Sequence, residues 1–201
     1  MSNIIDRNKF AVYIWTSNAL MHCVPAWAYL FNKFWPHKQN VRVLGYDKPT
    51  YDLPNNFEYI SLGTQRGPKY WSDDMAQYFS SPECEHEAFY LTTEDGFIVG
   101  DVDAELLDLA IKLSLSDPTG KFLKFCLTPD VHRRPKQVLK QFENYKLIKA
   151  NQNSLYRHSL SHCVWRKDRF LEKLIPNQSP WDFELDNRRA INDGYDIFAT
   201  E

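Results

Sequence analysis

Apolar residues near the start of the chain switch between two kinds of spacing. Residues 10–15 (F-A-V-Y-I-W) form an unbroken apolar run, which is typical of a strand buried on both faces of a parallel sheet. From Leu20 onward the apolar positions recur every three or four residues, which places them on one face of a helix. Pro36 cannot continue a helix and is predicted to end it. The helix face consists of Val24, Trp27, Phe31 and Phe34.

The same succession of strand and helix patterns continues along the chain. Ser72 and Asp103 are placed to cap two of the helices, and Ser179 with Pro180 has the pattern of a third helix start. Strands are expected at 10–15, 41–44, 57–62, 88–92 and 122–127, with two short ones between 146 and 165. Helices are expected from residue 20, at 70–79, from 103 to about 115, at 137–142, at 167–174, and from 179 to before Gly194. This succession predicts an α/β layered sheet.

Length and charge narrow the possible classes of protein. A chain of 201 residues can bury one sizeable core, so residues 1–201 are expected to form a single domain. The formal net charge of −2 provides no basic field, and no nucleic-acid partner is expected. The basic string His132-Arg133-Arg134 is interpreted as solvated loop charge. Aromatic residues make up 15% of the chain, with six Trp, which predicts clefts lined by rings.

Cysteine placement and hydropathy favour a cytoplasmic protein. The four cysteines, Cys23, Cys84, Cys126 and Cys163, form no C-x-x-C pair and are interpreted as buried thiols in a reducing compartment. Residues 10–32 lack Asp, Glu, Lys and Arg, but polar residues and a proline interrupt them. They are therefore predicted to form a strand and a helix, and no transmembrane segment is expected.

Candidate chemistry lies where the predicted strands end. In open α/β sheets, ligands bind outside the carboxyl ends of the strands. Thr16 and Ser17 follow the first strand, Asp47 follows the second, and Glu94 and Asp95 follow the strand that begins at residue 88. Two adjacent carboxylates at the end of a buried strand suit Mg²⁺ or Mn²⁺ bridging to a diphosphate. The alternative is that residues 94–96 form only a turn.

Other acidic residues also have two interpretations. Asp103 is interpreted as a helix cap, with Asp101 left open. Asp73 and Asp74 fall in the first turn of a helix, where acids are favourable without any function. Asp182 matches a capping box with Ser179, and Glu184 does not. A carboxylate at this helix start can act as a general base, while Trp181 stacks on a sugar or base ring; the alternative is a surface acid on a capped helix.

Several strings taken together carry a resemblance to a known group. V-L-G-Y-D-K-P, W-S-D-D-M, F-Y-L-T-T-E-D-G-F and S-P-W-D-F-E-L resemble strings of small bacterial and viral glycosyltransferase-like proteins of the GT-A superfamily. The resemblance covers most of the chain from Phe10. It implies a single-domain, Rossmann-like α/β/α fold with a mostly parallel central sheet, and a donor site near the first strands. The D-x-D metal motif of that superfamily matches residues 93–95, which implies Asp95 as the main metal ligand and Glu94 as a secondary one.

The resulting hypothesis is a hexosyltransferase-like glycosyltransferase. It would move a sugar from a nucleoside diphosphate donor to a hydroxyl acceptor, either a glycan or a lipid-linked sugar, with Mn²⁺ or Mg²⁺. The donor-binding candidates are Thr16, Ser17, Asp47 and Asp74; the base candidates are Glu184 and Asp182; the acceptor-binding candidate is Trp181. Two alternatives remain: an inactive relative that binds nucleotide sugars or glycans, and a metal-dependent phosphoryl-transfer or hydrolytic enzyme. The hypothesis requires the 94–95 pair and the late acid to share one cleft.

Overall fold

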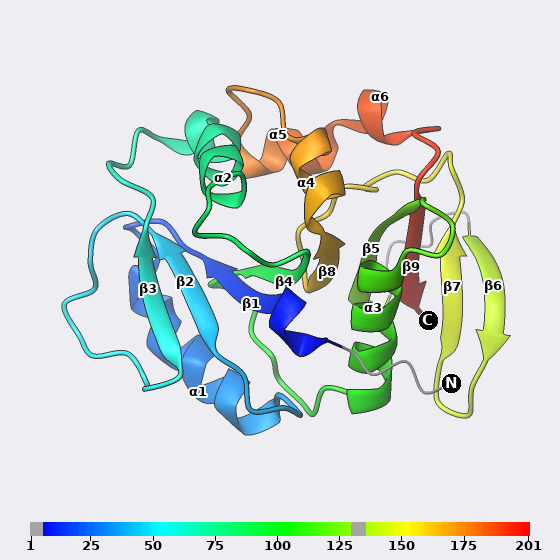
Figure 1. The fold of residues 1–201 in the computed structure, drawn as a ribbon, viewed down its shortest axis with the longest axis horizontal. Coiled ribbons are helices and arrows are strands. Elements are labelled where there is room, and N and C mark those ends of the chain that lie inside the picture. The colour runs from blue at the N-terminus through cyan, green and yellow to red at the C-terminus, as the bar shows by residue number, and fades with distance from the viewer. Residues whose placement is uncertain (1–5, 130–135) are drawn as a thin grey trace.

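A nine-stranded sheet runs through the centre of the protein, as a computed structural model shows (Figure 1). The structure describes residues 6–129 and 136–201, so the basic string 132–134 lies outside the described residues. The strand order is β3-β2-β1-β4-β8-β5-β9-β7-β6. The strands are β1 Phe10–Trp15, β2 Val41–Gly45, β3 Phe57–Ser61, β4 Ala88–Thr93, β5 Phe122–Pro129, β6 Lys136–Gln141, β7 Lys146–Ala150, β8 Cys163–Arg166 and β9 Asp196–Thr200.

The first four strands form a parallel unit. β3, β2, β1 and β4 are neighbours in that order, and all three of their pairings are parallel. Val12 of β1 is aligned with Val41 on one side and with Tyr90 on the other. The chain order reverses between β1 and β4, because β2 and β3 lie on one side of β1 and β4 lies on the other. Such a switch point is where ligands bind in sheets of this kind.

The rest of the sheet corrects the expectation of a mostly parallel arrangement. Beyond β4, four of the five pairings are antiparallel, namely β4–β8, β8–β5, β9–β7 and β7–β6; β5 and β9 pair in parallel. The protein is therefore mixed α/β. The physical reason is that β8 and β7 run against their neighbours, and the antiparallel hairpin β6–β7 adds two more strands.

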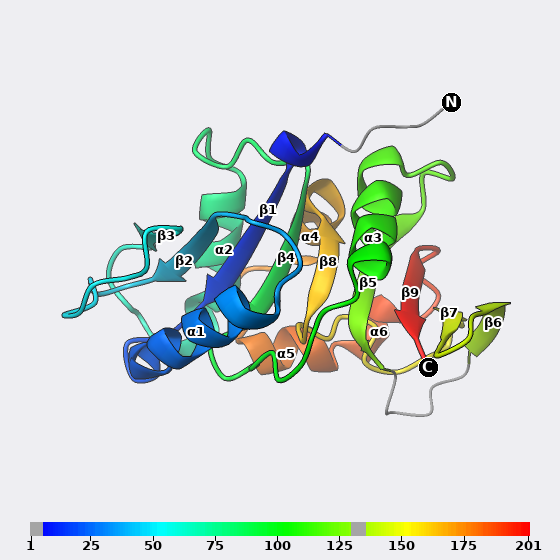
Figure 2. The ribbon, with the colours of Figure 1, turned by 90° about the horizontal axis from the view of Figure 1, so that it is seen from below.

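Helices cover both faces of the sheet (Figures 1 and 2). They are α1 Val24–Phe34, α2 Trp71–Phe79, α3 Ala104–Ser116, α4 Lys167–Lys173, α5 Pro180–Leu185 and α6 Asn187–Ala190, with short 3-10 helices η1 Arg7–Lys9, η2 Met21–Cys23 and η3 Pro68–Tyr70. None of the helices within residues 6–129 and 136–201 is long and apolar enough to cross a membrane. Residues 10–32 divide into β1, η2 and most of α1, as the interrupted apolar pattern predicts.

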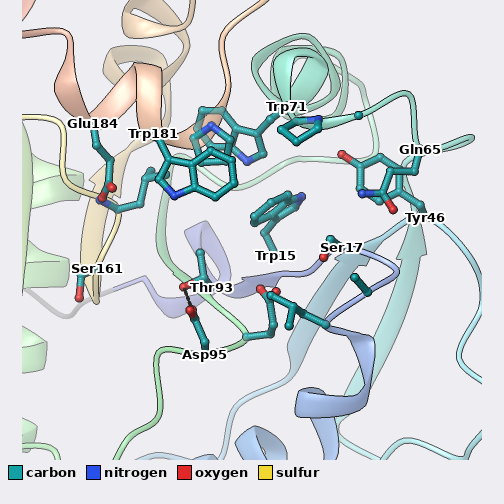
Figure 3. A pocket seen from close by; sticks show the side chains of 17 residues that line it. Trp15, Ser17, Tyr46, Gln65, Trp71, Thr93, Asp95, Ser161, Trp181 and Glu184 are labelled. Atoms are coloured by element: carbon teal, nitrogen blue, oxygen red, sulfur yellow. Dashed lines mark hydrogen bonds between the residues drawn. The ribbon is translucent and has the colours of Figure 1, made fainter.

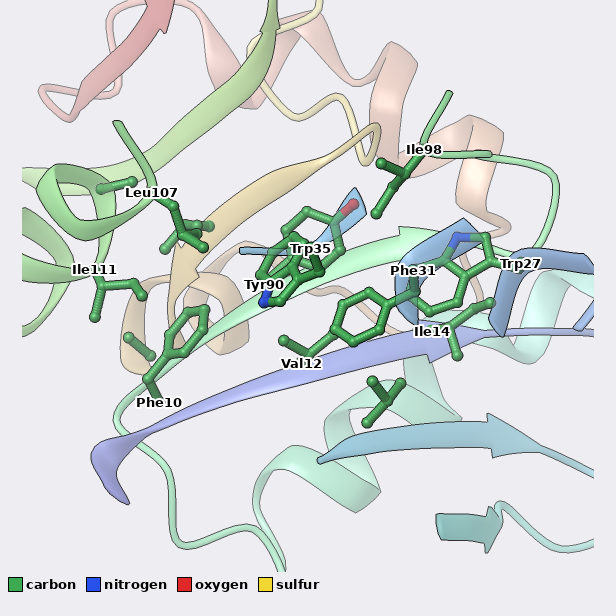
Figure 4. Packing of buried hydrophobic residues seen from close by; sticks show 14 of the residues in the cluster. Phe10, Val12, Ile14, Trp27, Phe31, Trp35, Tyr90, Ile98, Leu107 and Ile111 are labelled. Atoms are coloured by element: carbon green, nitrogen blue, oxygen red, sulfur yellow. The ribbon is translucent and has the colours of Figure 1, made fainter. Parts of the chain in front are cut away.

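The alternation of side chains along β1 divides the core into two layers. Val12 and Ile14 pack in one cluster with residues of α1 and α3 (Figure 4). Ala11 and Tyr13 point to the opposite face and pack with residues of α2, α4 and α5. Successive strand residues face opposite sides of a sheet, so the continuous apolar run of β1 is what a strand covered on both faces requires.

Helix starts and ends agree with the sequence in part. Asp103 accepts a hydrogen bond from the Leu106 amide and caps α3, as expected. Ser72 does not cap a helix: it lies inside α2, and its Oγ accepts a hydrogen bond of 2.9 Å from the amide of Gln178. The helix expected from residue 179 to before Gly194 ends at Leu185, and a second short helix follows.

Two predictions for the second half of the chain are wrong. Residues 137–142 were expected to form a helix, and most of them belong to strand β6, which pairs with β7. Strand β9 was not expected at all. The two short strands expected between 146 and 165 are present as β7 and most of β8. Of the four cysteines, Cys84, Cys126 and Cys163 are buried and Cys23 is partly buried.

Candidate functional site

A pocket of about 420 Å³ lies at the carboxyl ends of β1 and β4 (Figure 3). Trp15 and Thr93 are the last residues of these two parallel strands and are aligned with one another. The segments that follow them therefore leave the sheet side by side at the switch point. The pocket is lined by residues from six parts of the chain: Trp15, Ser17, Ala19, Leu20, Tyr46, Gln65, Gly67, Pro68, Trp71, Thr93, Glu94, Asp95, Leu160, Ser161, Pro180, Trp181 and Glu184.

The carboxylate of Glu94 is buried in the wall of this pocket. Its side chain is 1% exposed, and its Oε2 atom has no hydrogen-bond partner among the described residues. Burial raises the pKa of Glu94 to about 7, and the negative charge of Asp95 adds to the rise, whereas backbone hydrogen bonds at Glu94 and Ser17 oppose it. A buried oxygen without a partner is uncommon. It can accept a hydrogen bond from a ligand or bind a cation.

Asp95 occupies a different environment from its neighbour. It is exposed, and its Oδ1 accepts a hydrogen bond of 2.6 Å from the hydroxyl of Thr93. The amide of Gly96 donates to the carbonyl of Thr93, so residues 93–96 form a turn as well as part of the pocket wall. The segment therefore forms the turn that the alternative interpretation expects, and residues 93–95 also line the pocket.

The carboxylates of Glu94 and Asp95 fit a cation shared with a substrate. Within the described residues there is no group of three or more His, Cys, Asp and Glu that could hold a metal ion, so a cage built by the protein alone is not present there. Mg²⁺ needs fewer protein ligands than such a cage provides, because one or two carboxylates together with substrate phosphates and water are enough to bind it. The unpartnered oxygen of Glu94 is the observation that fits this mode of binding.

Glu184 reaches the same pocket from α5. Its Oε1 accepts a hydrogen bond of 2.6 Å from the amide of Leu160, and both residues line the pocket. Phe183 is buried beside it and packs on Trp71 with ring centroids 5.3 Å apart. The packing of Phe183 on Trp71 and the hydrogen bond from Leu160 thus fix where the carboxylate of Glu184 lies. The 94–95 pair and the late acid share one cleft, as the hypothesis requires.

Asp182 is engaged in a different way. Its Oδ2 accepts hydrogen bonds from the amide and the hydroxyl of Ser179, and its own amide donates to Ser179, which completes a capping box. These bonds lower the pKa of Asp182. The residue is absent from the pocket lining. The bonds thus hold the Asp182 carboxylate at the start of its own helix, and its role as a base stays a prediction.

Three indole rings contribute to the walls of the pocket. Trp181 is 62% exposed and stands beside the opening. Trp71 is 1% exposed, and its Nε1 has no hydrogen-bond partner among the described residues. Trp15 contacts Trp71 edge to face, with ring centroids 6.3 Å apart. The pocket thus combines apolar ring faces with an unpartnered donor on Trp71 and an unpartnered acceptor on Glu94, a combination typical of sites for polar ring-shaped ligands.

Of the donor-binding candidates, only Ser17 lines the pocket. Thr16 is fully buried and donates its hydroxyl to the carbonyl of Ser17, because a residue that continues the pleat of β1 points into the core. Asp47 is exposed and accepts a hydrogen bond of 2.6 Å from Asn18. It lines a separate hollow with His22 and Tyr51.

Asp74 supports the pocket from behind. It is buried and accepts hydrogen bonds from the hydroxyl of Tyr46, at 2.9 Å, and from the guanidinium of Arg66. Tyr46 lines the pocket and Asp74 does not, so Asp74 positions a ring and makes no contact with a ligand there. A direct contact of Asp74 with a donor stays a prediction that the pocket lining does not support.

Sequence reasoning missed several lining residues. Trp15, Tyr46 and Trp71 were assigned to a strand, a turn and a helix face, and Gln65 was not singled out. Trp15 and Tyr46 carried a usable signal, because each stands at or just after the carboxyl end of a predicted strand. Gln65 lies in a loop with no periodic pattern, and no signal in the sequence marks it.

Compared with known proteins, the chain matches no protein family and no curated protein sequence. The functional argument therefore depends on the geometry of the pocket.

Proposed function

We propose that this protein is a glycosyltransferase that moves a sugar from a nucleoside diphosphate donor to a hydroxyl acceptor. The observation that carries the proposal is the pocket at the switch point, in which the buried carboxylate of Glu94, the exposed carboxylate of Asp95 and the late acid Glu184 line one cavity with Trp181. The parallel order β3-β2-β1-β4 is that of a mononucleotide-binding unit, which supports the donor half of the proposal and the GT-A resemblance.

The donor would lie across the ends of β1 and β4. The nucleoside contacts Ser17 and the ring of Tyr46, and the diphosphate extends toward residues 94–95. Asp95 and Glu94 would hold the Mn²⁺ or Mg²⁺. When bound, that cation neutralises the charge that develops on the leaving diphosphate. The protein supplies only these two carboxylates, so the cation binds together with the donor.

Glu184 is the base in this proposal. Its Oε1 is held by the amide of Leu160, which leaves Oε2 to accept the proton of the acceptor hydroxyl. The acceptor oxygen then forms a bond to the anomeric carbon of the sugar, the bond from that carbon to the diphosphate oxygen breaks, and the nucleoside diphosphate leaves with the electron pair. Trp181 provides a ring face on which the acceptor can stack.

The test is turnover of nucleotide sugars by the full chain. The protein is incubated with UDP-, GDP-, TDP- and ADP-sugars with Mn²⁺ or Mg²⁺, and the release of nucleoside diphosphate is measured. We expect release with at least one donor, dependence on the cation, and loss in Glu184→Gln. No release and no thermal shift with any donor would contradict the proposal.

One feature favours a second candidate, a donor-binding protein without turnover. The first position of the 93–95 triplet is not acidic, and the hydroxyl of Thr93 already occupies one oxygen of Asp95. A protein of this kind would bind a nucleotide sugar without a cation. Donor binding that persists in Asp95→Ala, with no nucleotide released, would select this candidate over the transferase.

A further inference from the structure

A second hollow lies directly beside the candidate site. Its volume is about 280 Å³, which is at the low end for ligand pockets, so it fits part of a ligand better than a whole one. It lies under the segment that connects β4 to α3. Its lining is mostly apolar and consists of Trp35, Tyr90, Phe97, Ile98, Val99, Asp101, Val102, Asp103, Leu106, Leu127, Thr128 and His162.

Two segments of the chain contribute residues to both the second hollow and the main pocket. Residues 93–95 line the main pocket, and Phe97, two residues further along the chain, lines the hollow. Leu160 and Ser161 line the main pocket, and His162 lines the hollow. Residues 93–97 and 160–162 therefore form the boundary between the two cavities, whose linings have no residue in common. An elongated ligand would have to pass this boundary to occupy both cavities.

The charges of the lining disfavour an anionic occupant. No Lys or Arg is present in the described lining, and Asp101 and Asp103 stand at the rim, so a phosphate would be repelled. The carboxylate of Asp103 is already used in capping α3. Val99 at the rim is 84% exposed, and Phe97 is also exposed. Apolar side chains left in water around an apolar hollow favour an apolar occupant.

His162 provides one polar contact in this hollow. It adopts a left-handed conformation with φ of 46°, which is uncommon outside glycine and often marks a functional position. This conformation directs the ring to Tyr90, whose hydroxyl lies 2.5 Å from Nδ1 of His162. Burial lowers the pKa of His162, so the ring is neutral at pH 7. Its Nε2 remains for a hydrogen bond to a ligand.

We propose that the second hollow is the subsite for the apolar part of the acceptor, an alkyl or aromatic aglycone, with its sugar end in the main pocket beside Glu184. The inference rests on the proposed function, because it assigns the hollow to the acceptor. Among hydroxyl acceptors it selects lipid-linked or aryl-linked sugars over free glycans. Each methylene buried in the hollow adds to the affinity, and the effect does not depend on the identity of the sugar.

The experiment compares two probes that share a sugar. Binding of octyl β-D-glucopyranoside below its micelle concentration and of methyl β-D-glucopyranoside is measured by calorimetry with the full chain. We expect the octyl probe to bind at least about tenfold more tightly. Val102→Trp fills the hollow, and Val99→Asp places a charge at its rim on an exposed side chain that folding does not need. Both variants are expected to reduce the preference to less than about threefold.

A matched control separates the hollow from the general surface. Val138 on β6 is half exposed, and Val138→Asp is expected to keep the full octyl preference. Equal binding of the two probes would overturn the proposal. So would an octyl preference that survives in both hollow variants, or one that Val138→Asp also removes.

The two proposals can fail separately. Nucleotide release by the wild-type protein without any preference for the octyl probe would overturn the proposal of the apolar subsite and keep that of the transferase. An octyl preference that depends on the hollow, without nucleotide release from any donor, would leave the apolar subsite and remove the transferase.

Discussion

The Oε1 atom of Glu184 accepts a hydrogen bond of 2.6 Å from the backbone amide of Leu160. This bond joins the last turn of α5 to the segment that leads into β8, and both residues line the pocket. A backbone partner fixes one oxygen of the carboxylate without neutralising its charge. In the proposed mechanism Glu184 is thereby oriented in advance for the role of a base, and its two oxygens have separate tasks.

This division of tasks predicts the result of a conservative substitution. Glu184→Gln keeps an oxygen for the Leu160 amide but removes the proton acceptor, so we expect nucleotide release with an acceptor to fall by about 100-fold or more. The free energy of unfolding should change by less than about 0.5 kcal/mol. Single-turnover rates and urea unfolding measure the two quantities. Wild-type turnover in Glu184→Gln would remove this residue from the mechanism.

Asp182→Ala is the matched control, two residues away on the same helix. It breaks the capping box with Ser179 and should cost about 1 kcal/mol of stability, while turnover stays close to that of the wild type. A large loss of turnover at unchanged stability would mean that the capping acid and not Glu184 reaches the acceptor.

The buried carboxylate of Glu94 predicts a pH dependence of stability. Its pKa rises from an ordinary 4.5 to about 7 on folding because of burial, so the folded protein holds a proton that the unfolded chain releases. The stabilising effect is full below pH 4.5 and is lost as the pH rises through 7, with an upper limit of roughly 3 kcal/mol. Urea unfolding without divalent cations between pH 4.5 and 8 measures it.

Glu94→Gln isolates this contribution from that of other groups. The amide is neutral at every pH, so the stability of the wild type relative to the variant should fall by up to roughly 3 kcal/mol as the pH rises across that window. Histidines titrate equally in both proteins and cancel in the difference. Parallel pH profiles for the two proteins would show that Glu94 is not buried as described.

Gly96 is predicted to tolerate no side chain. A Cβ atom there would lie 2.5 Å from the hydroxyl of Thr92 and 3.2 Å from the carbonyl of Thr93. Gly96→Ala should therefore shift the 93–96 turn and cost roughly 1–3 kcal/mol, with weaker donor binding. Gly100→Ala is the control, because a Cβ at Gly100 meets nothing within 4 Å. Equal thermal stability of the two variants would contradict the prediction.

Substitution of Trp181 should affect mainly ligand binding, and substitution of Trp71 should affect mainly the stability of the fold. Trp181 is 62% exposed, so Trp181→Ala should change the free energy of unfolding by less than about 0.5 kcal/mol and weaken ligand binding by about fivefold to tenfold. Trp71 is buried, and Trp71→Ala should cost about 3–5 kcal/mol. Calorimetric binding and urea unfolding of each variant test both statements. Unchanged binding in Trp181→Ala would exclude stacking on its ring.

The first half of the fold could be predicted from the sequence because its signals are local. The apolar run of β1, the helix face of α1 and the cap at Asp103 each depend on neighbouring residues only. The partner and direction of a strand depend on distant residues, and a short strand such as β8 carries no sign of the direction in which it runs. The mostly parallel sheet was therefore the part of the fold that failed.

The site followed the same rule. Glu94 was singled out because it directly follows β4, and Ser17 because it lies two residues after the end of β1. Thr16 was expected to reach the donor, but its side chain is buried in the core. Successive side chains of a strand face opposite sides, and the sequence pattern did not show on which side the residue after β1 would lie. Strand β6 was mistaken for a helix because its apolar residues, Val138 and Leu139, are adjacent. They match neither the alternation of a strand nor the three- to four-residue spacing of a helix face, and both are exposed.

The position of β9 sets an order of events during synthesis. Within the described sheet, the hairpin of β6 and β7 is joined to the other strands through β9. Synthesis of β9 begins fifty residues after that of β7. The hairpin must therefore wait, undocked, while α4, α5 and α6 emerge. The parallel unit of β1 to β4 needs no such delay, so it can assemble on a chain whose sheet is still open beside β4.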